Sequence, residues 1–143
     1  MKEEIEENRL EKELTYPGVS DRVKAAVTDS FIIVGFMFIA AYSFSQFESV
    51  PDNLRIMTFI FIFGLYDPIF TSFLGATLGH MAMNLRVRSK NDNEKKINFP
   101  IAIIRFIVKF FLGIVSLLTV GNNKKHLAIH DLVAGSIVIY KKN

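Results

Sequence analysis

The sequence predicts a small all-α membrane protein, and three observations support that prediction. Half of the 143 residues are hydrophobic, and the mean hydropathy is +0.30. Two long apolar segments occupy residues 23–44 and 56–74, and a third occupies residues 101–120. We therefore expect a small bundle of two full transmembrane helices plus a third spanning or re-entrant apolar helix, with a small cytoplasmic β-sheet element.

The first apolar segment, from Val23 to Phe44, is long enough to cross the roughly 30 Å hydrocarbon core at about 1.5 Å per residue. Asp29 lies near its start, and a charge at that depth is costly unless it is paired or hydrated. Arg22 shares the same helical face but lies about 10 Å away along the axis. We therefore expect Asp29 to take a partner from another segment, with Arg105 and Lys109 as candidates.

The second apolar segment, from Ile56 to Leu74, is interrupted by Asp67 and Pro68. Pro68 has no N–H, so the carbonyl of Gly64 loses its helical partner and a kink is expected. A freed carbonyl beside a carboxylate can bind a cation. The alternative is a kink capped by water, with Asp67 near the cytoplasmic interface. Asp29 and Asp67 together form a possible cation or proton site.

Two short runs predict the sheet. From Met83 to Val87, apolar and polar residues alternate, as in a half-buried strand. Residues 136–140, SIVIY, are mostly β-branched and predict a second strand. A lone strand is not stable, so we expect these two to pair. Ile97 and Phe99 are expected to begin a strand that returns from the first.

The distribution of Lys and Arg predicts a cytoplasmic N-terminus. Five precede or flank the start of the first span, five more lie in residues 84–98, and none lies in residues 45–53. The positive-inside rule places the first two groups in the cytoplasm. If residues 101–120 cross fully, Lys124 and Lys141 lie outside; a bend near Gly113, or a position along the interface, keeps them inside. We favour the inside position, because the two strands must lie on the same side to pair.

Several functional classes are excluded or disfavoured. The chain has no Cys, which excludes disulfides and thiolate chemistry. Basic residues flank apolar segments rather than forming one stripe, so no nucleic-acid partner is expected. His126, His130 and Asp131 have a spacing that could hold a metal, but no further ligand is evident, so no metal site is predicted. No nucleophile-base constellation or phosphate-binding loop is found, so we expect no enzyme and no cofactor.

The chain divides into a polar acidic cytoplasmic tail, residues 1–17, and a membrane domain, residues 18–143. Residues 1–13 hold six Glu against three Lys or Arg. In the membrane domain, Arg105 and Lys109 lie one turn apart on one face, and the alternative to an ion pair is that both reach the headgroups. The run GATLG, residues 75–79, is either a surface for close helix approach or a turn that requires Gly.

The order of these features resembles the RDD family of small bacterial integral membrane proteins. That family has an arginine at the start of the first span, an aspartate within it and a later aspartate, which here are Arg22, Asp29 and Asp131. GATLGHMAMNLRV and HDLVAGSIVI resemble two further motifs of the family over about residues 18–141; His80 stands where the family usually has Lys, and Ser136 where it has Thr. The motif residues are Gly75, Thr77, Gly79, His130 and Gly135.

The resemblance implies a bacterial cytoplasmic (inner) membrane protein, and some members look like cation/proton antiporters. One hypothesis is a monovalent cation/proton exchanger that uses Asp29 and Asp67, working as a homo-oligomer in the lipid bilayer. The alternative is a non-catalytic structural or assembly subunit of a larger membrane complex. In both, an intramembrane charge cluster is expected at the cytoplasmic half of the bundle: Arg22, Asp29, Arg105 and Asp131.

Overall fold

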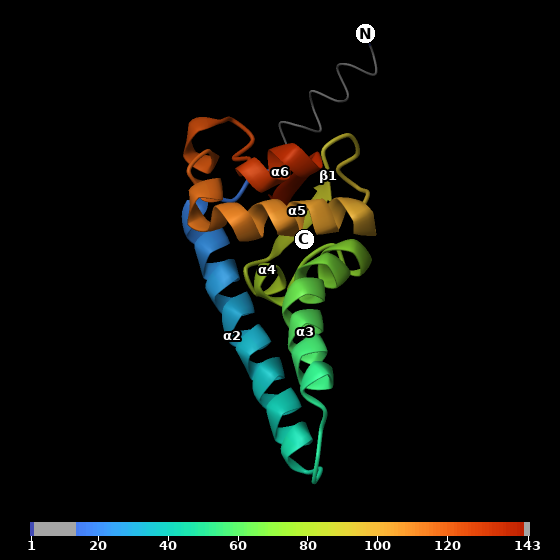
Figure 1. Cartoon of the computed structure of the whole chain (residues 1–143). Coiled ribbons are helices and arrows are strands. Elements are labelled where there is room, and N and C mark those ends of the chain that lie inside the picture. Colours follow the sequence, from blue (N-terminus) through green and yellow to red (C-terminus); the bar gives the residue numbers. More distant parts are fainter. Residues whose placement is uncertain (2–13, 142–143) are drawn as a thin grey trace.

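Two long helices form most of the molecule. The computed structural model describes residue 1 and residues 14–141. Helix α2 (Val19–Ser45) and helix α3 (Asp52–Phe73) run in opposite directions and are joined at one end by a short loop (Figure 1). Both are long and apolar enough to cross a membrane. Large apolar side chains such as Phe38 and Phe61 are 72% and 62% exposed on them, which is the surface that lipid covers in a spanning helix.

Helix α3 continues through Pro68. Its last turns are deflected from the axis of the earlier turns (Figure 1), as expected where a proline removes a hydrogen bond and its ring crowds the preceding turn. A turn follows at Gly75, whose φ of 75° suits glycine. The chain then forms the short helix α4 (Leu78–Ala82), which lies between α2 and α3 at the open end of the hairpin (Figure 1).

Helix α5 (Phe99–Leu112) lies across the open end of the hairpin rather than along it (Figure 1). It ends at Gly113, where φ is 49°, and continues as two short 3₁₀ turns, η1 (Gly113–Leu117) and η2 (Val120–Asn122). The segments on either side of the break differ in direction by 111°. The structure therefore has the bend near Gly113. By length and composition, the bent pair is either a broken third span or a re-entrant loop, which are the two alternatives that the sequence left open.

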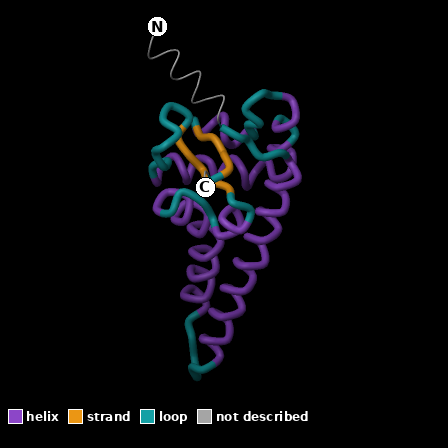
Figure 2. Tube along the Cα trace, turned by 180° about the vertical axis from the view of Figure 1, so that it is seen from behind, coloured by secondary structure: helices purple, strands orange, loops and turns teal. Residues whose placement is uncertain are grey.

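The sheet has two antiparallel strands, β1 (Leu85–Ser89) and β2 (Ser136–Tyr140), with Val87 opposite Val138. The predicted pairing is confirmed. Helix α6 (Ile129–Ala134) precedes β2 and ends at Gly135 in the left-handed conformation. Figure 2 shows the strands at the end of the molecule away from the loop between α2 and α3. The predicted returning strand at residues 97–99 is wrong, because Asn98 caps α5 and Phe99 begins it.

Each face of the sheet packs on a different part of the chain. On one face, a fully buried cluster includes Leu85, Val87 and Val138 from the strands, with Ala25 of α2 and Ala102 of α5. On the other, residues of β2 pack with Leu127 and receive the partly buried Leu14 and Tyr16. The N–H of Tyr140 also donates to the carbonyl of Thr15 at 3.0 Å. Residues 14–16 are thus attached to the sheet, whereas residues 2–13 of the predicted tail lie outside the described residues.

Candidate functional site

Six ionisable side chains from four helices converge where α4 and α5 meet the open end of the hairpin. Five of these residues are at most 5% exposed, and the lysine side chain is 27% exposed. Three are basic and three are acidic, so their formal charges cancel. We call this set the polar centre: Arg22, Asp29, Asp67, Arg105, Lys109 and Asp131.

Asp131 binds two arginines. Its Oδ2 accepts from Nη1 of Arg22 at 2.6 Å, and its Oδ1 accepts from Nε of Arg105 at 3.1 Å. The hydroxyl of Ser136 and the N–H of Ala128 donate more weakly, at 3.3 and 3.4 Å. Burial alone raises the pKa of Asp131, but the two guanidinium groups outweigh burial and hold it below its usual range. Asp131 is therefore a buried anion that links the starts of α2 and α6 to α5.

Asp67 binds Lys109 and shares Arg105 with Asp131. Its Oδ2 accepts from the ammonium of Lys109 at 2.7 Å, and its Oδ1 accepts from Nη1 of Arg105 at 3.3 Å and from the hydroxyl of Thr71 at 3.0 Å. Arg105 therefore bridges Asp67 and Asp131. Positions 105 and 109 lie one helical turn apart, as the sequence indicated. Their acidic partner is Asp67 rather than the predicted Asp29.

Asp29 is bound mainly by neutral donors. Its Oδ1 accepts from the Tyr66 hydroxyl and from the N–H of Gly79, both at 2.7 Å, and its Oδ2 accepts from the Thr77 hydroxyl at 2.6 Å. Nδ1 of His80 lies 3.8 Å away. The predicted charge pairing of this carboxylate with an arginine is a misassignment. The turns around α4 bring hydroxyl and amide donors onto Asp29, while Asp131 takes up the guanidinium of Arg22.

The motif residues occupy positions that explain their residue types. At Gly79 a Cβ would overlap the carbonyl oxygen of Ala25 and lie 2.6 Å from the Asp29 carboxyl carbon. Only glycine lets α4 approach α2 this closely. Both alternatives for residues 75–79 are therefore present, namely close helix approach at Gly79 and a turn at Gly75. His130 contacts the hydroxyl of Ser116 at 2.6 Å. Burial, together with the neighbouring arginines and lysine, lowers the pKa of His130 to about 3 although Asp131 opposes the shift, so the imidazole is neutral.

A cleft between α2, α3 and α5 opens onto two of the three acids. Its volume is about 180 Å³. Its polar lining residues are Asp29, Asp67, Lys109, Ser30 and Tyr66, and the other lining residues are apolar. We call this space the carboxylate cleft. The residues that line it are Ala26, Asp29, Ser30, Ile33, Phe63, Tyr66, Asp67, Phe106, Lys109 and Phe110.

Sequence reasoning paired Asp29 and Asp67 as one candidate site and missed Tyr66. In the structure Asp29 and Asp67 both line the same cleft, and Tyr66 is bound to Asp29. The signal was present, because Tyr66 is the only tyrosine in the second apolar segment and directly precedes Asp67. A buried phenol in an apolar environment needs a hydrogen-bond partner. The partner of Tyr66 is Asp29 and not Asp67, its neighbour in the sequence.

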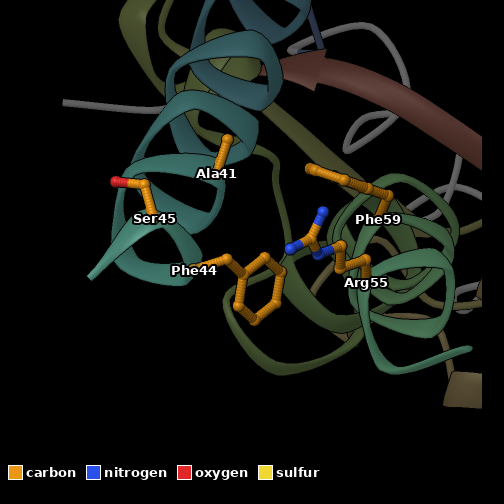
Figure 3. Close-up of a pocket in the computed structure, with 5 residues that line it drawn as sticks. All are labelled: Ala41, Phe44, Ser45, Arg55 and Phe59. Atoms are coloured by element: carbon orange, nitrogen blue, oxygen red, sulfur yellow. The ribbon is translucent and has the colours of Figure 1, made fainter. Parts of the chain in front are cut away.

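A second cavity lies at the other end of the hairpin. Its volume is about 220 Å³, and Figure 3 shows the side chains of Phe44, Arg55 and Phe59 around it, with Ala41 and Ser45. It contains a guanidinium and no carboxyl group, so it does not suit a cation. Within residues 14–141, no group of three or more His, Asp or Glu side chains is placed to hold a metal ion.

Comparisons with known proteins give one finding. A family model described as the RDD family matches residues 16–135. These residues contain the whole polar centre and all of the motif residues. No curated protein matches the chain, and no solved structure matches it.

Proposed function

The chain belongs to the RDD family, and we propose that it exchanges a monovalent cation for a proton at Asp29 and Asp67 in the bacterial cytoplasmic (inner) membrane. One observation carries the proposal: Asp29 and Asp67 line the same cleft. An acid that binds a proton and an acid that binds a cation must be close for the two ligands to compete. The chemistry is reversible binding with no covalent step, so the proposal includes no enzyme activity.

Helix geometry supports a position inside the lipid for both acids. Asp29 lies 16 residues before the end of α2 at Ser45, which corresponds to about 24 Å along the axis. Asp67 lies 15 residues after the start of α3 at Asp52, which corresponds to about 22 Å. In a roughly 30 Å hydrocarbon core that begins at the loop end of the hairpin, both lie about 6–8 Å inside the opposite boundary. With the basic N-terminal side in the cytoplasm, that boundary is the cytoplasmic one.

The charge balance supports competition between the two ligands. With three cations and three anions, the polar centre is formally neutral when all its acids are ionised and His80 and His130 are neutral. A proton on Asp29 or a cation at Asp67 adds one positive charge in a poorly solvated space. Having both present adds two like charges at short range, which is unfavourable where the dielectric is low. Binding of one ligand therefore favours release of the other.

Lys109 is the group best placed to give way to the cation. Its ammonium binds Asp67 at 2.7 Å, yet its side chain is 27% exposed and lines the cleft. Arg105, in contrast, is fully buried between two acids. A flexible lysine stem can withdraw from Asp67 without breaking the rest of the network. In the proposed cycle the Lys109 ammonium moves away from Asp67 but stays in the cleft that it lines. The cation bound at Asp67 then adds its own positive charge, while Arg105 stays in place.

The proposed working unit is a homo-oligomer, because a hairpin and one bent helix are a small structure for a complete path across the membrane. The exposed aromatic surfaces of α2 and α3 provide area for lipid and for neighbouring copies. If the chain is instead an assembly subunit of a larger complex, the same polar centre is a static structural element. The two functions differ in whether the isolated protein moves protons.

Reconstitution into liposomes separates these functions. The purified protein is placed in vesicles with a pH-sensitive dye inside, and gradients of Na⁺, K⁺ or Li⁺ are imposed in turn. We expect at least one cation to drive proton movement in the wild type, and Asp29→Asn and Asp67→Asn to abolish it. Asp92→Asn is the matched control, because this acid is 39% exposed and bound to Lys95 in the loop after β1. Wild-type vesicles that move no protons with any of these cations refute exchange and leave the assembly role.

A further inference from the structure

A hydroxyl lies between the carboxyl of Asp29 and an imidazole. Oγ1 of Thr77 is 2.6 Å from Oδ2 of Asp29 and 2.5 Å from Nδ1 of His80. Thr77 is fully buried, and His80 is 5% exposed. The three groups form a continuous chain of short contacts from α2 to the start of α4. Resemblance to the RDD motifs assigns no role to His80, since the family usually has Lys there.

The number of hydrogens restricts how Asp29, Thr77 and His80 can be hydrogen-bonded to one another. A threonine hydroxyl has one hydrogen to donate, so it cannot donate to both neighbours at once. If it donates to an ionised Asp29, then Nδ1 of His80 must carry a hydrogen and donate to Oγ1. If Asp29 is protonated and donates to Oγ1, the hydroxyl donates to a bare Nδ1. When Nε2 of His80 carries a hydrogen in both, the two arrangements differ only in the positions of two hydrogens.

We propose that Thr77 and His80 form the path by which Asp29 gains and loses its proton. The proposal rests on the proposed exchange for its physiological use, but the coupling between the three side chains can be tested without transport. His80 is the group that accepts and delivers the proton, and Thr77 transmits it. Neither residue binds the transported cation.

The transfer step conserves hydrogens and charge. A proton that reaches Nε2 makes His80 an imidazolium. The Nδ1–H bond then breaks as its proton passes to Oγ1 of Thr77, while the Oγ1–H bond breaks as that proton passes to Oδ2 of Asp29. The imidazolium and the carboxylate become a neutral imidazole and a carboxylic acid, and Thr77 again has one hydrogen. The reverse step returns the proton when a cation enters the cleft.

The other contacts of Asp29 orient it for this step. Tyr66 and the N–H of Gly79 both donate to Oδ1, which leaves Oδ2 turned toward Thr77. The Tyr66 hydroxyl accepts from the N–H of Leu78 at 3.2 Å, and a backbone amide does not release a proton at ordinary pH. Of the two hydroxyls on Asp29, only Thr77 therefore leads to a titratable group.

The charges around His80 favour onward transfer of a proton. Burial, together with the cations of Arg105 and Lys109 on α5, lowers the pKa of His80 well below its ordinary value, while Asp67 opposes this shift and Arg22 adds to it. Asp29 on α2 also faces the imidazole, with its Oδ2 3.8 Å from Nδ1. An imidazolium in these surroundings is unstable, so a proton that reaches His80 does not stay there.

Nitrogen NMR of the protein in detergent micelles tests the coupling. The nitrogen shifts of His80 report which ring nitrogen carries the hydrogen. At alkaline pH, with Asp29 ionised, we expect the hydrogen on Nδ1. In Asp29→Asn, the two donors at Oδ1 fix the amide so that its NH₂ replaces Oδ2 and donates to Thr77. The Thr77 hydroxyl then donates to Nδ1, and the hydrogen of His80 moves to Nε2.

Variants at Thr77 complete this arm of the test. Thr77→Ser keeps the hydroxyl, and we expect it to preserve the tautomer change caused by Asp29→Asn. Thr77→Val removes it, and we expect the change to vanish. The side chain of Thr77 also accepts from the N–H of His80 at 3.3 Å and caps α4, so both variants are first checked for retained fold. The same tautomer in the wild type and in Asp29→Asn overturns the path.

Transport provides the second arm. At saturating cation we expect Thr77→Val and His80→Gln to slow proton movement on the order of 100-fold, as for loss of a positioned acid-base group, and Thr77→Ser to stay near the wild-type rate. Wild-type rates in Thr77→Val overturn the path even if exchange is real. If the wild type moves no protons, the exchange proposal fails, while the NMR arm still decides whether the three groups share protons.

Discussion

Asp131→Asn is predicted to destabilise the fold severely. Asp131 is fully buried and accepts from Arg22 at 2.6 Å and from Arg105 at 3.1 Å, and these two residues are 4% and 0% exposed. An amide of the same size leaves the buried Arg22 guanidinium without its anionic partner and leaves Arg105 with Asp67 alone, at 3.3 Å. Each charge-assisted hydrogen bond contributes about 1.5–3 kcal/mol, and breaking a buried ion pair costs about 3–5 kcal/mol. We expect a loss of about 4 kcal/mol, a large fraction of the roughly 5–15 kcal/mol typical of domains.

The assay is equilibrium unfolding in mixed micelles, in which the fraction of dodecyl sulfate in dodecyl maltoside is raised and helicity is followed. Asp92→Asn is the control, because its ion pair with Lys95 lies at the surface, where such pairs contribute about 0–1 kcal/mol. If Asp131→Asn lowers the free energy of unfolding by no more than this control does, the buried network does not hold the helices together and the reasoning is wrong.

Three further predictions concern the surroundings of the polar centre. Gly79→Ala should destabilise the fold, since a Cβ there overlaps the α2 backbone. Gly64→Ala, where a Cβ has nothing within 4 Å, should be neutral or stabilising by up to about 1 kcal/mol. Unfolding in mixed micelles compares the stability of the two variants. His130 has its pKa lowered to about 3 on folding, so the unfolded chain binds the extra proton and stability falls as pH drops from about 6.5 toward that value. His130→Asn should flatten this part of the stability–pH curve, and an unchanged curve would contradict the assignment. Tyr66→Phe removes one donor from Asp29 and should cost about 1–2 kcal/mol; no loss would mean that the phenol is dispensable there.

The spans and the strand pair follow from local patterns. An apolar run as long as the one that ends at Phe44 predicts a helix that spans a membrane. The alternation of apolar and polar residues from Met83 to Val87 predicts a strand with one apolar face. The first strand begins two residues later than the pattern, at Leu85, because Asn84 adopts a positive φ of 57° after α4. Gly113 marked the bend of the third segment. These features depend on residues that are close together in the sequence, so one sequence is enough to predict them.

The partners of Asp29 were not predictable in the same way. Arg22 and Asp29 do share a buried face of α2, but which acid meets which base depends on how α4, α5 and α6 enter the space beside that face. The close approach at Gly79 brings donors onto Asp29, and Asp131 reaches Arg22 from the other end of the chain. Hydrophobic periodicity does not encode such long-range contacts. The sequence therefore identified the acids and bases of the polar centre and misassigned the partners of Asp29.

Proton release on cation addition tests the central claim most directly. Purified protein in weakly buffered micelles receives Na⁺, K⁺ or Li⁺ across a series of pH values, and a pH indicator records the protons released. If Asp29 and Asp67 hold competing ligands in the carboxylate cleft, one of these salts releases protons from the wild type, and the double variant Asp29→Asn, Asp67→Asn releases none. Release that persists in the double variant, or a wild type that releases nothing with any salt, contradicts the account.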